Sequence, residues 1–257
     1  MSMQRMGRST LRASLLVLSL IALLFASGSS AAQMPKLPSL GGLTGQSAGG
    51  ALGAGLSDSQ IGSGLKEALS VGTQKAVKLV SRPGGYLDNE AIKILLPKSL
   101  QPAEKVLRAA GQGPRIDEFI ASMNHAAESA APEAASIFGD AVKEMTIDDA
   151  RRLLNGGDTS ITDYFKEKTS AKLAAAFRPH VEAAMSANGV TQKYEELKGS
   201  APKLPFGMGS GGGFDINTYV VNGALNGLFY MLAQQEKEIR SNPAARSTSL
   251  LKQVFSH

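Results

Sequence analysis

The sequence predicts an all-α protein: a single compact domain of short packed helices that follows a signal peptide and a glycine-rich tether. Apolar residues recur at the three- and four-residue spacing of amphipathic helices through most of the chain after Leu56. No stretch shows the alternating apolar and polar residues of a half-buried strand. The chain has no cysteine, so a packed apolar core rather than a disulfide framework has to stabilise the domain.

The first 32 residues have the parts of a secretory signal. Arg5, Arg8 and Arg12 form a basic segment, and residues 13–26 are an uncharged, mostly apolar run of 14 residues. Such a run is shorter than the ~20 residues that a membrane-spanning helix needs. Ser-Ala-Ala then ends at Ala32 and fits the cleavage rule for signal peptides. We therefore expect residues 1–32 to be removed and the mature protein to be periplasmic or otherwise exported.

Residues 33–55 contain seven glycines, two prolines and a single charged side chain. This composition is typical of a flexible tether. An alternative stays open, because Gly41, Gly45, Gly49 and Gly53 recur every four residues, the spacing that lets helices approach closely in a bilayer. In that case residues 33–55 would make a peripheral membrane contact.

The mature chain is nearly neutral. The full chain has 27 basic and 22 acidic residues, and three of the arginines lie in the signal segment, which leaves 24 against 22 and a net charge of +2. A large basic field that attracts nucleic acid is therefore not expected. About 200 residues follow Leu56, enough for one domain over 56–257 with a sizeable core.

Capping residues predict the first helices. Ser57 and Gln60 form a capping box for a helix that ends at residues 82–85, Arg-Pro-Gly-Gly. Residues 86–97 fit either a short strand or a short helix. Residues 99–110 are expected to form a helix that a glycine ends.

Prolines mark the starts of the next two helices, at Pro114 and Pro132. The second of these helices is expected to bury Ala135 and Phe138. Pro179 is expected to kink or restart a later, long helix.

The C-terminal part is expected to begin with a short helix over 191–197 and a glycine-rich loop over 199–213. Asp215 then caps the longest helix, which ends at Asn242-Pro243. Residues 250–255 form a terminal amphipathic turn or helix.

The densest helix signals lie between residues 145 and 175. Thr146 and Asp149 predict a second capping box. A corner with the sequence Asn-Gly-Gly-Asp-Thr follows at residues 155–159. We expect Gly156 and Gly157 to end the first helix in the left-handed conformation and Asp158 to cap the next helix.

This corner is also the candidate binding site, although its chemistry has two interpretations. Asp148, Asp149, Asp158 and Asp163 are the one concentration of carboxylates, and a carboxylate pair can perform acid–base work if burial separates the two pKa values. N-capping and the favourable interaction of negative charge with the helix dipole explain the positions of these aspartates without a catalytic role. The candidate binding residues are Asn155, Gly156, Gly157, Asp158, Thr159, Asp163 and Tyr164.

The sequence predicts no catalytic residue, no metal site and no cofactor. His125 precedes Glu128 by one helical turn, but a metal site needs three or four ligands and no second such pair is evident. His180 and Glu182 lie on opposite sides of a helix, and His257 is the last residue. The glycine run over 207–213 lacks the lysine of a phosphate-binding loop.

Three stretches carry a resemblance to a known family: LKEALSVGTQKAV (65–77), MTIDDARRLLNGGDTSITDYFKEKT (145–169) and NPAARSTSLLKQVF (242–255). Together they resemble the bacterial domain-of-unknown-function family 4197 over essentially the whole mature domain. The resemblance implies an exported or envelope-associated bacterial protein. It supplies no catalytic residues.

These observations favour a non-catalytic envelope protein that binds either a protein partner or an apolar small molecule between its helices, a common place for a pocket. One alternative is a hydrolase that uses the carboxylates of the Gly156-Gly157-Asp158 corner. The other is a membrane-associated structural protein that acts through the repeat from Gly41 to Gly53.

We predict that the exported form begins at Gln33 or one residue earlier, because the short apolar run is followed by Ser-Ala-Ala. Intact-mass measurement of the exported protein checks this. A mature form that retains Arg12 would contradict it.

Overall fold

The computed structural model describes residues 56–187, 215–246 and 248–255, and in this part of the chain every regular element is a helix. The predicted all-α class is therefore confirmed. The signal peptide (1–32), the tether (33–55), the helix over 191–197 and the loop over 199–213 lie outside the described residues.

The first helix, α1 (Asp58–Ser81), begins and ends as its caps predict. The Gln60 amide donates to the Ser57 hydroxyl at 3.3 Å, and the Ser57 amide donates to Gln60 Oε1 at 2.9 Å, which completes the capping box. Arg82 is extended and stops the helix. The chain then turns at Gly84, whose φ of +76° favours glycine.

Four helical elements follow. They are α2 (Gln101–Ala109), α3 (Gly113–Ala130), the 3₁₀ turn η1 (Ala131–Glu133) and α4 (Ala134–Glu144). Because the 3₁₀ turn is wound more tightly than an α-helix, it changes the phase of α4, so Ala134 is buried and Ala135 is exposed. The expected burial of Ala135 is therefore wrong, whereas that of Phe138 is confirmed.

The C-terminal half contains two long helices. The elements are α5 (Ile147–Leu154), α6 (Ser160–Ala187), α8 (Ile216–Ser241), the 3₁₀ turn η2 (Pro243–Ala245) and α9 (Ser249–Val254). Asp215 caps α8 by accepting the Asn217 amide at 2.9 Å, as predicted. α6 runs through Pro179 without restarting.

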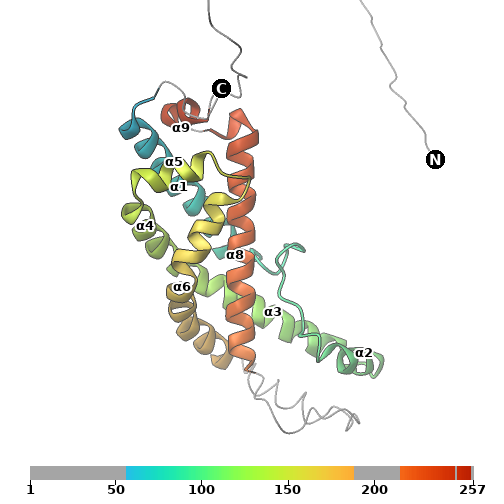
Figure 1. Ribbon diagram of the computed structural model, residues 1–257. Helices are drawn as coiled ribbons and strands as arrows, with labels where there is room; N and C mark the ends of the chain where they lie inside the picture. Colours follow the sequence, from blue (N-terminus) through green and yellow to red (C-terminus); the bar gives the residue numbers. More distant parts are fainter. Residues whose placement is uncertain (1–55, 188–214, 247, 256–257) are drawn as a thin grey trace, which may run out of the picture. The chain divides into compact units, whose positions relative to one another are not determined.

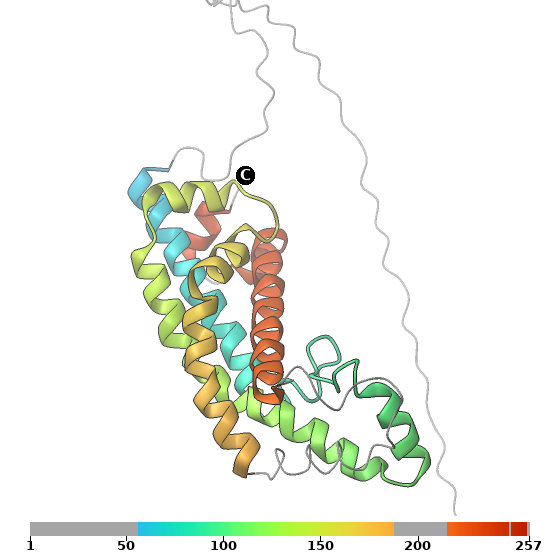
Figure 2. The ribbon, with the colours of Figure 1, turned by 60° about the horizontal axis from the view of Figure 1, so that its bottom comes forward.

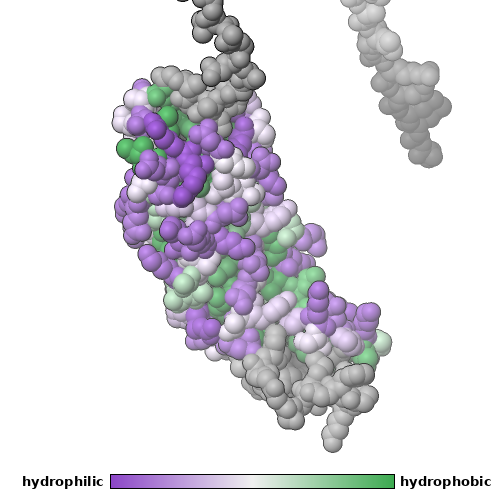
Figure 3. Space-filling view, in the orientation of Figure 1, coloured by the Kyte–Doolittle hydropathy of each residue, from purple (hydrophilic) through white to green (hydrophobic). Residues whose placement is uncertain are grey.

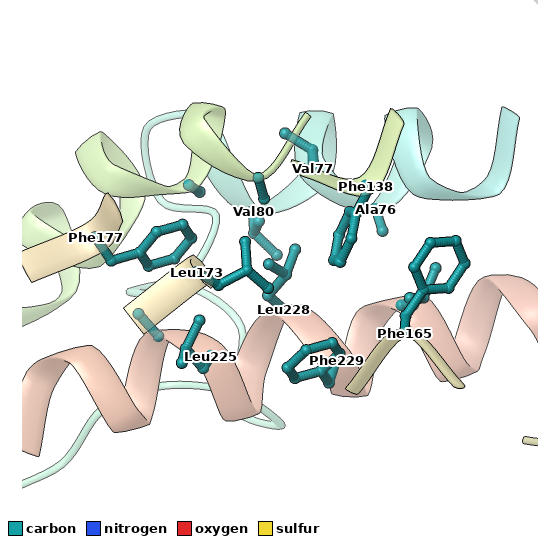
Figure 4. Close-up of a cluster of buried hydrophobic side chains, with 14 of the residues drawn as sticks. Ala76, Val77, Val80, Phe138, Phe165, Leu173, Phe177, Leu225, Leu228 and Phe229 are labelled. Carbon is teal, nitrogen blue, oxygen red and sulfur yellow. The ribbon is translucent and has the colours of Figure 1, made fainter. Parts of the chain in front are cut away.

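The core forms where α8 packs against α1, α3 and α6 and where α6 also packs against α3 (Figures 1 and 2). Helix α4 packs on α1 and α6. Aromatic rings fill its centre (Figure 4). The ring of Phe138 lies edge-on to that of Phe165, with centroids 5.1 Å apart, and 6.1 Å from that of Phe229. Such pairs stabilise a core beyond the area that they bury.

Residues 86–97 form neither the strand nor the helix that the sequence allows. The segment is irregular, yet Tyr86, Ile92, Ile94 and Leu96 are buried. A buried backbone needs hydrogen-bond partners, and side chains of α3 supply them. Asn124 Oδ1 accepts the Ile94 amide at 2.8 Å, and Asn124 Nδ2 donates to the Ile94 carbonyl at 2.9 Å.

A buried glutamate of α3 holds the start of the same segment. Glu128 Oε1 accepts the amides of Tyr86 and Leu87 at 3.0 and 3.1 Å. The Tyr86 phenol donates to the Ala224 carbonyl of α8 at 2.7 Å. Burial raises the pKa of Tyr86 far above its ordinary value, so the phenol remains a donor. The segment is thus fixed between α3 and α8.

Two glycines of α8 make room for this segment. A β-carbon at Gly227 would lie 2.4 Å from Cε1 of Tyr86, and one at Gly223 would lie 3.0 Å from Cδ1 of Ile94. The absence of side chains at Gly223 and Gly227 therefore allows residues 86–97 to lie close against α8.

We predict opposite effects for two helical Gly→Ala substitutions. Gly227→Ala should lower the free energy of unfolding by about 1–3 kcal/mol, because the new methyl group overpacks the buried Tyr86 ring. Gly139→Ala on α4 meets nothing within 4 Å and should raise it by about 0.5–1 kcal/mol. Urea unfolding measures the free energy of unfolding of both variants. Equal changes in the two variants would contradict the close packing of Tyr86 against Gly227.

Candidate functional site

The corner between α5 and α6 is preceded by the predicted capping box. The Asp149 amide donates to the Thr146 hydroxyl at 3.0 Å, and the Thr146 amide donates to Asp149 Oδ2 at 3.2 Å. Hydrogen bonds from the Thr146 hydroxyl and amide hold the pKa of Asp149 below its usual range. Asp149 is therefore a capping carboxylate, and α5 ends on the buried side chains of Leu153 and Leu154.

The corner itself does not use left-handed glycines. Among the described glycines, positive φ angles occur at Gly84 and Gly111, so the expected conformation of Gly156 and Gly157 is wrong. Gly156 is required for space instead, because a β-carbon there would lie 2.5 Å from that of Ser160. The Ser160 hydroxyl donates to the Leu153 carbonyl at 2.8 Å, so the chain folds back tightly on the end of α5.

Asp158 is not the N-cap of α6. The helix begins at Ser160, and the carbonyl of Thr159 accepts the Asp163 amide at 2.9 Å. The Asp158 side chain is exposed and has no hydrogen-bond partner within the part of the chain that the structure describes. The predicted cap is therefore wrong, and the first amides of α6 have a different acceptor.

That acceptor is Glu236 of α8, which lies 75 residues along the chain from Ile161. Glu236 Oε1 accepts the Ile161 amide at 3.0 Å, and Oε2 accepts the Thr162 amide at 2.9 Å. Oε2 also accepts the Thr162 hydroxyl at 2.8 Å. Glu236 is 4% exposed, so a buried carboxylate caps α6 from a neighbouring helix.

Arg240, one helical turn further along α8, completes the arrangement. Its Nε donates to Glu236 Oε1 at 3.0 Å, and its Nη1 and Nη2 donate to the carbonyls of Leu154 and Leu153 at 3.1 and 2.8 Å. Nη2 also donates to the Ser160 hydroxyl at 2.9 Å. We call Glu236 and Arg240 the corner clamp.

Each charged group of the corner clamp is opposite in sign to the partial charge of the helix end that it binds. The C-terminal carbonyls of α5 carry partial negative charge and face the Arg240 guanidinium. The N-terminal amides of α6 carry partial positive charge and face the Glu236 carboxylate. The ion pair and its backbone partners therefore fix where α5 stops and α6 starts.

Sequence reasoning missed the corner clamp, although a signal was present. Leu228, Leu232, Glu236 and Arg240 follow one another at four-residue spacing, so the charged pair continues the apolar stripe of α8. Charges in register with a buried stripe are exceptional, because charged residues are almost never fully buried unless they are paired.

A small cavity lies beside the corner clamp, between α1, α6, α8 and α9. Its volume is about 20 Å³, and its lining includes Gly72, Phe255 and both clamp residues. The Arg240 guanidinium lies 5.9 Å from the centre of the Phe255 ring. This space holds about one water molecule, whereas small-molecule pockets occupy roughly 300–1,000 Å³.

The other candidate residues divide into structural and exposed groups. Asn155 closes α5 by donating from Nδ2 to the Arg151 carbonyl at 3.0 Å. Tyr164 is 7% exposed, its ring lies edge-on to that of Phe165, and burial raises its pKa. Gly157, Asp158 and Asp163 are exposed, and Asp163 accepts a hydrogen bond from the Thr159 hydroxyl at 3.3 Å.

The two histidines that the structure describes, His125 and His180, each contact a glutamate. His125 Nδ1 lies 2.9 Å from Glu128 Oε2, on the glutamate that holds residues 86 and 87. His180 Nε2 lies 3.2 Å from Glu133 Oε1. Within the described ranges, no three histidine, aspartate or glutamate side chains come together in a group that could hold a metal ion.

The described domain is thus all-helical, and the corner clamp joins two of its helix ends. The chain is a member of a protein family of unknown function, DUF4197, whose model matches residues 55–256. The resemblance seen in the sequence is therefore confirmed. Comparison with curated proteins and with solved structures found no match.

We predict that the corner clamp dominates the stability of the corner. Glu236→Ala removes the acceptor of the buried Ile161 and Thr162 amides and leaves the part-buried Arg240 guanidinium without its carboxylate, and it should lower the free energy of unfolding by about 3–5 kcal/mol. Asp158→Ala, the matched control, should change it by less than about 0.5 kcal/mol because that side chain makes no described contact. Urea unfolding of both variants is the measurement. A larger loss for Asp158→Ala than for Glu236→Ala would restore Asp158 as the cap.

Proposed function

We propose that this protein is a non-catalytic binding domain of the bacterial cell envelope and that the corner between α5 and α6 contacts a protein partner. The observation that carries the proposal is the contrast between the two sides of the corner. Its backbone is fixed by buried groups, whereas Gly157, Asp158 and Asp163 are exposed.

Such an arrangement suits binding. Loops that a rigid scaffold positions are where binding residues concentrate. A turn that is already ordered loses little conformational freedom when a partner binds, and this lowers the cost of association. Two exposed carboxylates, Asp158 just before α6 and Asp163 in its first turn, favour a partner with basic side chains.

A hydrolase at the corner and an apolar ligand between the helices have less support. A hydrolase would need two carboxylates whose environments differ, and Asp158 and Asp163 are both exposed. An apolar ligand would need far more room than the cavity of about 20 Å³ beside the corner clamp. A protein partner needs neither burial of the carboxylates nor a cavity.

The envelope location is part of the proposal and rests on the signal segment over residues 1–32. No helix in the described part of the chain is long and apolar enough to cross a bilayer. We propose that residues 33–55 tether the domain after cleavage, with a glycine-zipper contact in the membrane as the alternative.

A charge reversal in the corner tests the partner contact. Asp158→Arg should remove a bound partner, because it places a cation where the partner presents basic side chains. Glu167→Arg makes the same change on the exposed side of α6 and is the matched control. Cells expressing each variant are cross-linked, and the proteins attached to the exported domain are quantified by mass spectrometry. Identical sets of attached proteins would contradict the proposal.

A further inference from the structure

The helix α2 has little buried surface. None of its side chains that the structure describes is buried, and Glu104 and Leu107 are only half-buried. Its main packing partner is α3, and Figures 1 and 2 both show it beside the start of α3, away from α4 and α6. A short helix with so little burial has a large surface left for another contact.

One exposed face of α2 is apolar. Pro102, Val106 and Ala109 are exposed and share one face at the spacing of a helical turn. Val106 is 50% exposed, and Leu95, in the segment that leads into α2, is 53% exposed. Figure 3 shows hydrophobic surface at the position of α2 with hydrophilic residues around it.

Cations are concentrated in the same stretch. Five basic residues and one acidic residue lie between Lys93 and Arg115. Acidic residues flank the stretch on both sides, Asp88 and Glu90 before it and Asp117 and Glu118 after it, so its individual unpaired cations matter rather than a net charge.

Three of these cations are available for a ligand. Lys98, Lys105 and Arg115 are exposed, and none forms an ion pair with a residue that the structure describes. Arg108, by contrast, forms ion pairs within the domain. It donates to Glu104 at 2.9 Å and to Asp117 of α3 at 2.7 Å, and so holds α2 against α3.

We propose that Leu95, Lys98, Lys105, Val106 and Arg115, the α2 surface, bind an anionic lipid bilayer. Apolar side chains that enter the boundary between headgroups and acyl chains, with cations beside them at the phosphates, are the signature of helices that lie on membranes. Long basic side chains reach the phosphates while their stems cover apolar surface. This contact is separate from the partner contact at the corner and from residues 33–55.

The test is co-sedimentation of the purified exported form with vesicles. Phosphatidylcholine vesicles that contain phosphatidylglycerol should bind it roughly tenfold or more tightly than vesicles of phosphatidylcholine alone, with affinity falling as salt rises. The double variant Lys98→Glu/Lys105→Glu should lose roughly tenfold or more of this affinity. Val106→Ser should lose severalfold, because one apolar side chain no longer enters the bilayer.

Matched variants elsewhere on the domain are the controls. Lys166→Glu/Lys172→Glu makes the same charge change on exposed positions of α6, and Ile147→Ser replaces a side chain of α5 that is 48% exposed. Both should bind vesicles like the unchanged protein, and thermal unfolding confirms that each variant is folded. The proposal is overturned if the unchanged protein binds neither kind of vesicle, as a protein-binding surface would, or if the α2 variants bind no more weakly than the controls.

Discussion

The connection between α5 and α6 depends on one largely buried ion pair, Glu236 with Arg240 on α8. Burying two charges costs free energy that their mutual attraction alone often fails to offset. Here both groups have further partners, because the carboxylate caps the start of α6 and the guanidinium binds the last carbonyls of α5. Since the unpaired ends of two helices need such partners, the pair determines the path of the chain between them.

A second buried acid follows the same principle. Glu128 and Asn124 of α3 supply the hydrogen bonds that residues 86–97 lack because they form no regular element. Tyr86 and two glycines of α8 close the other side. Both deeply buried acids of the domain that the structure describes, Glu128 and Glu236, therefore serve backbone amides. Because both buried acids bind the protein's own backbone, the proposed binding functions lie on the surface of the domain.

Two surfaces of the domain are proposed to bind a partner, and they differ in chemistry. The corner between α5 and α6 presents carboxylates on a fixed turn, whereas the α2 surface presents cations and apolar side chains on a lightly packed helix. A domain that held a membrane with one surface and a protein with the other would bring its partner to the bilayer. Neither role needs a pocket.

The sequence by itself determined the all-α class, the capping boxes at Ser57 and Thr146, and the burial of Phe138, because caps and amphipathic periodicity act within a few residues of the chain. It also placed the corner at residues 155–159. Only the tertiary structure decided what holds that corner. Local rules predicted Asp158 as the cap and left-handed glycines, but Glu236 lies far away in sequence and reaches the amides only when α8 packs on α6. The irregular path of residues 86–97 was decided in the same way, because its hydrogen bonds come from α3 and its space from the glycines of α8.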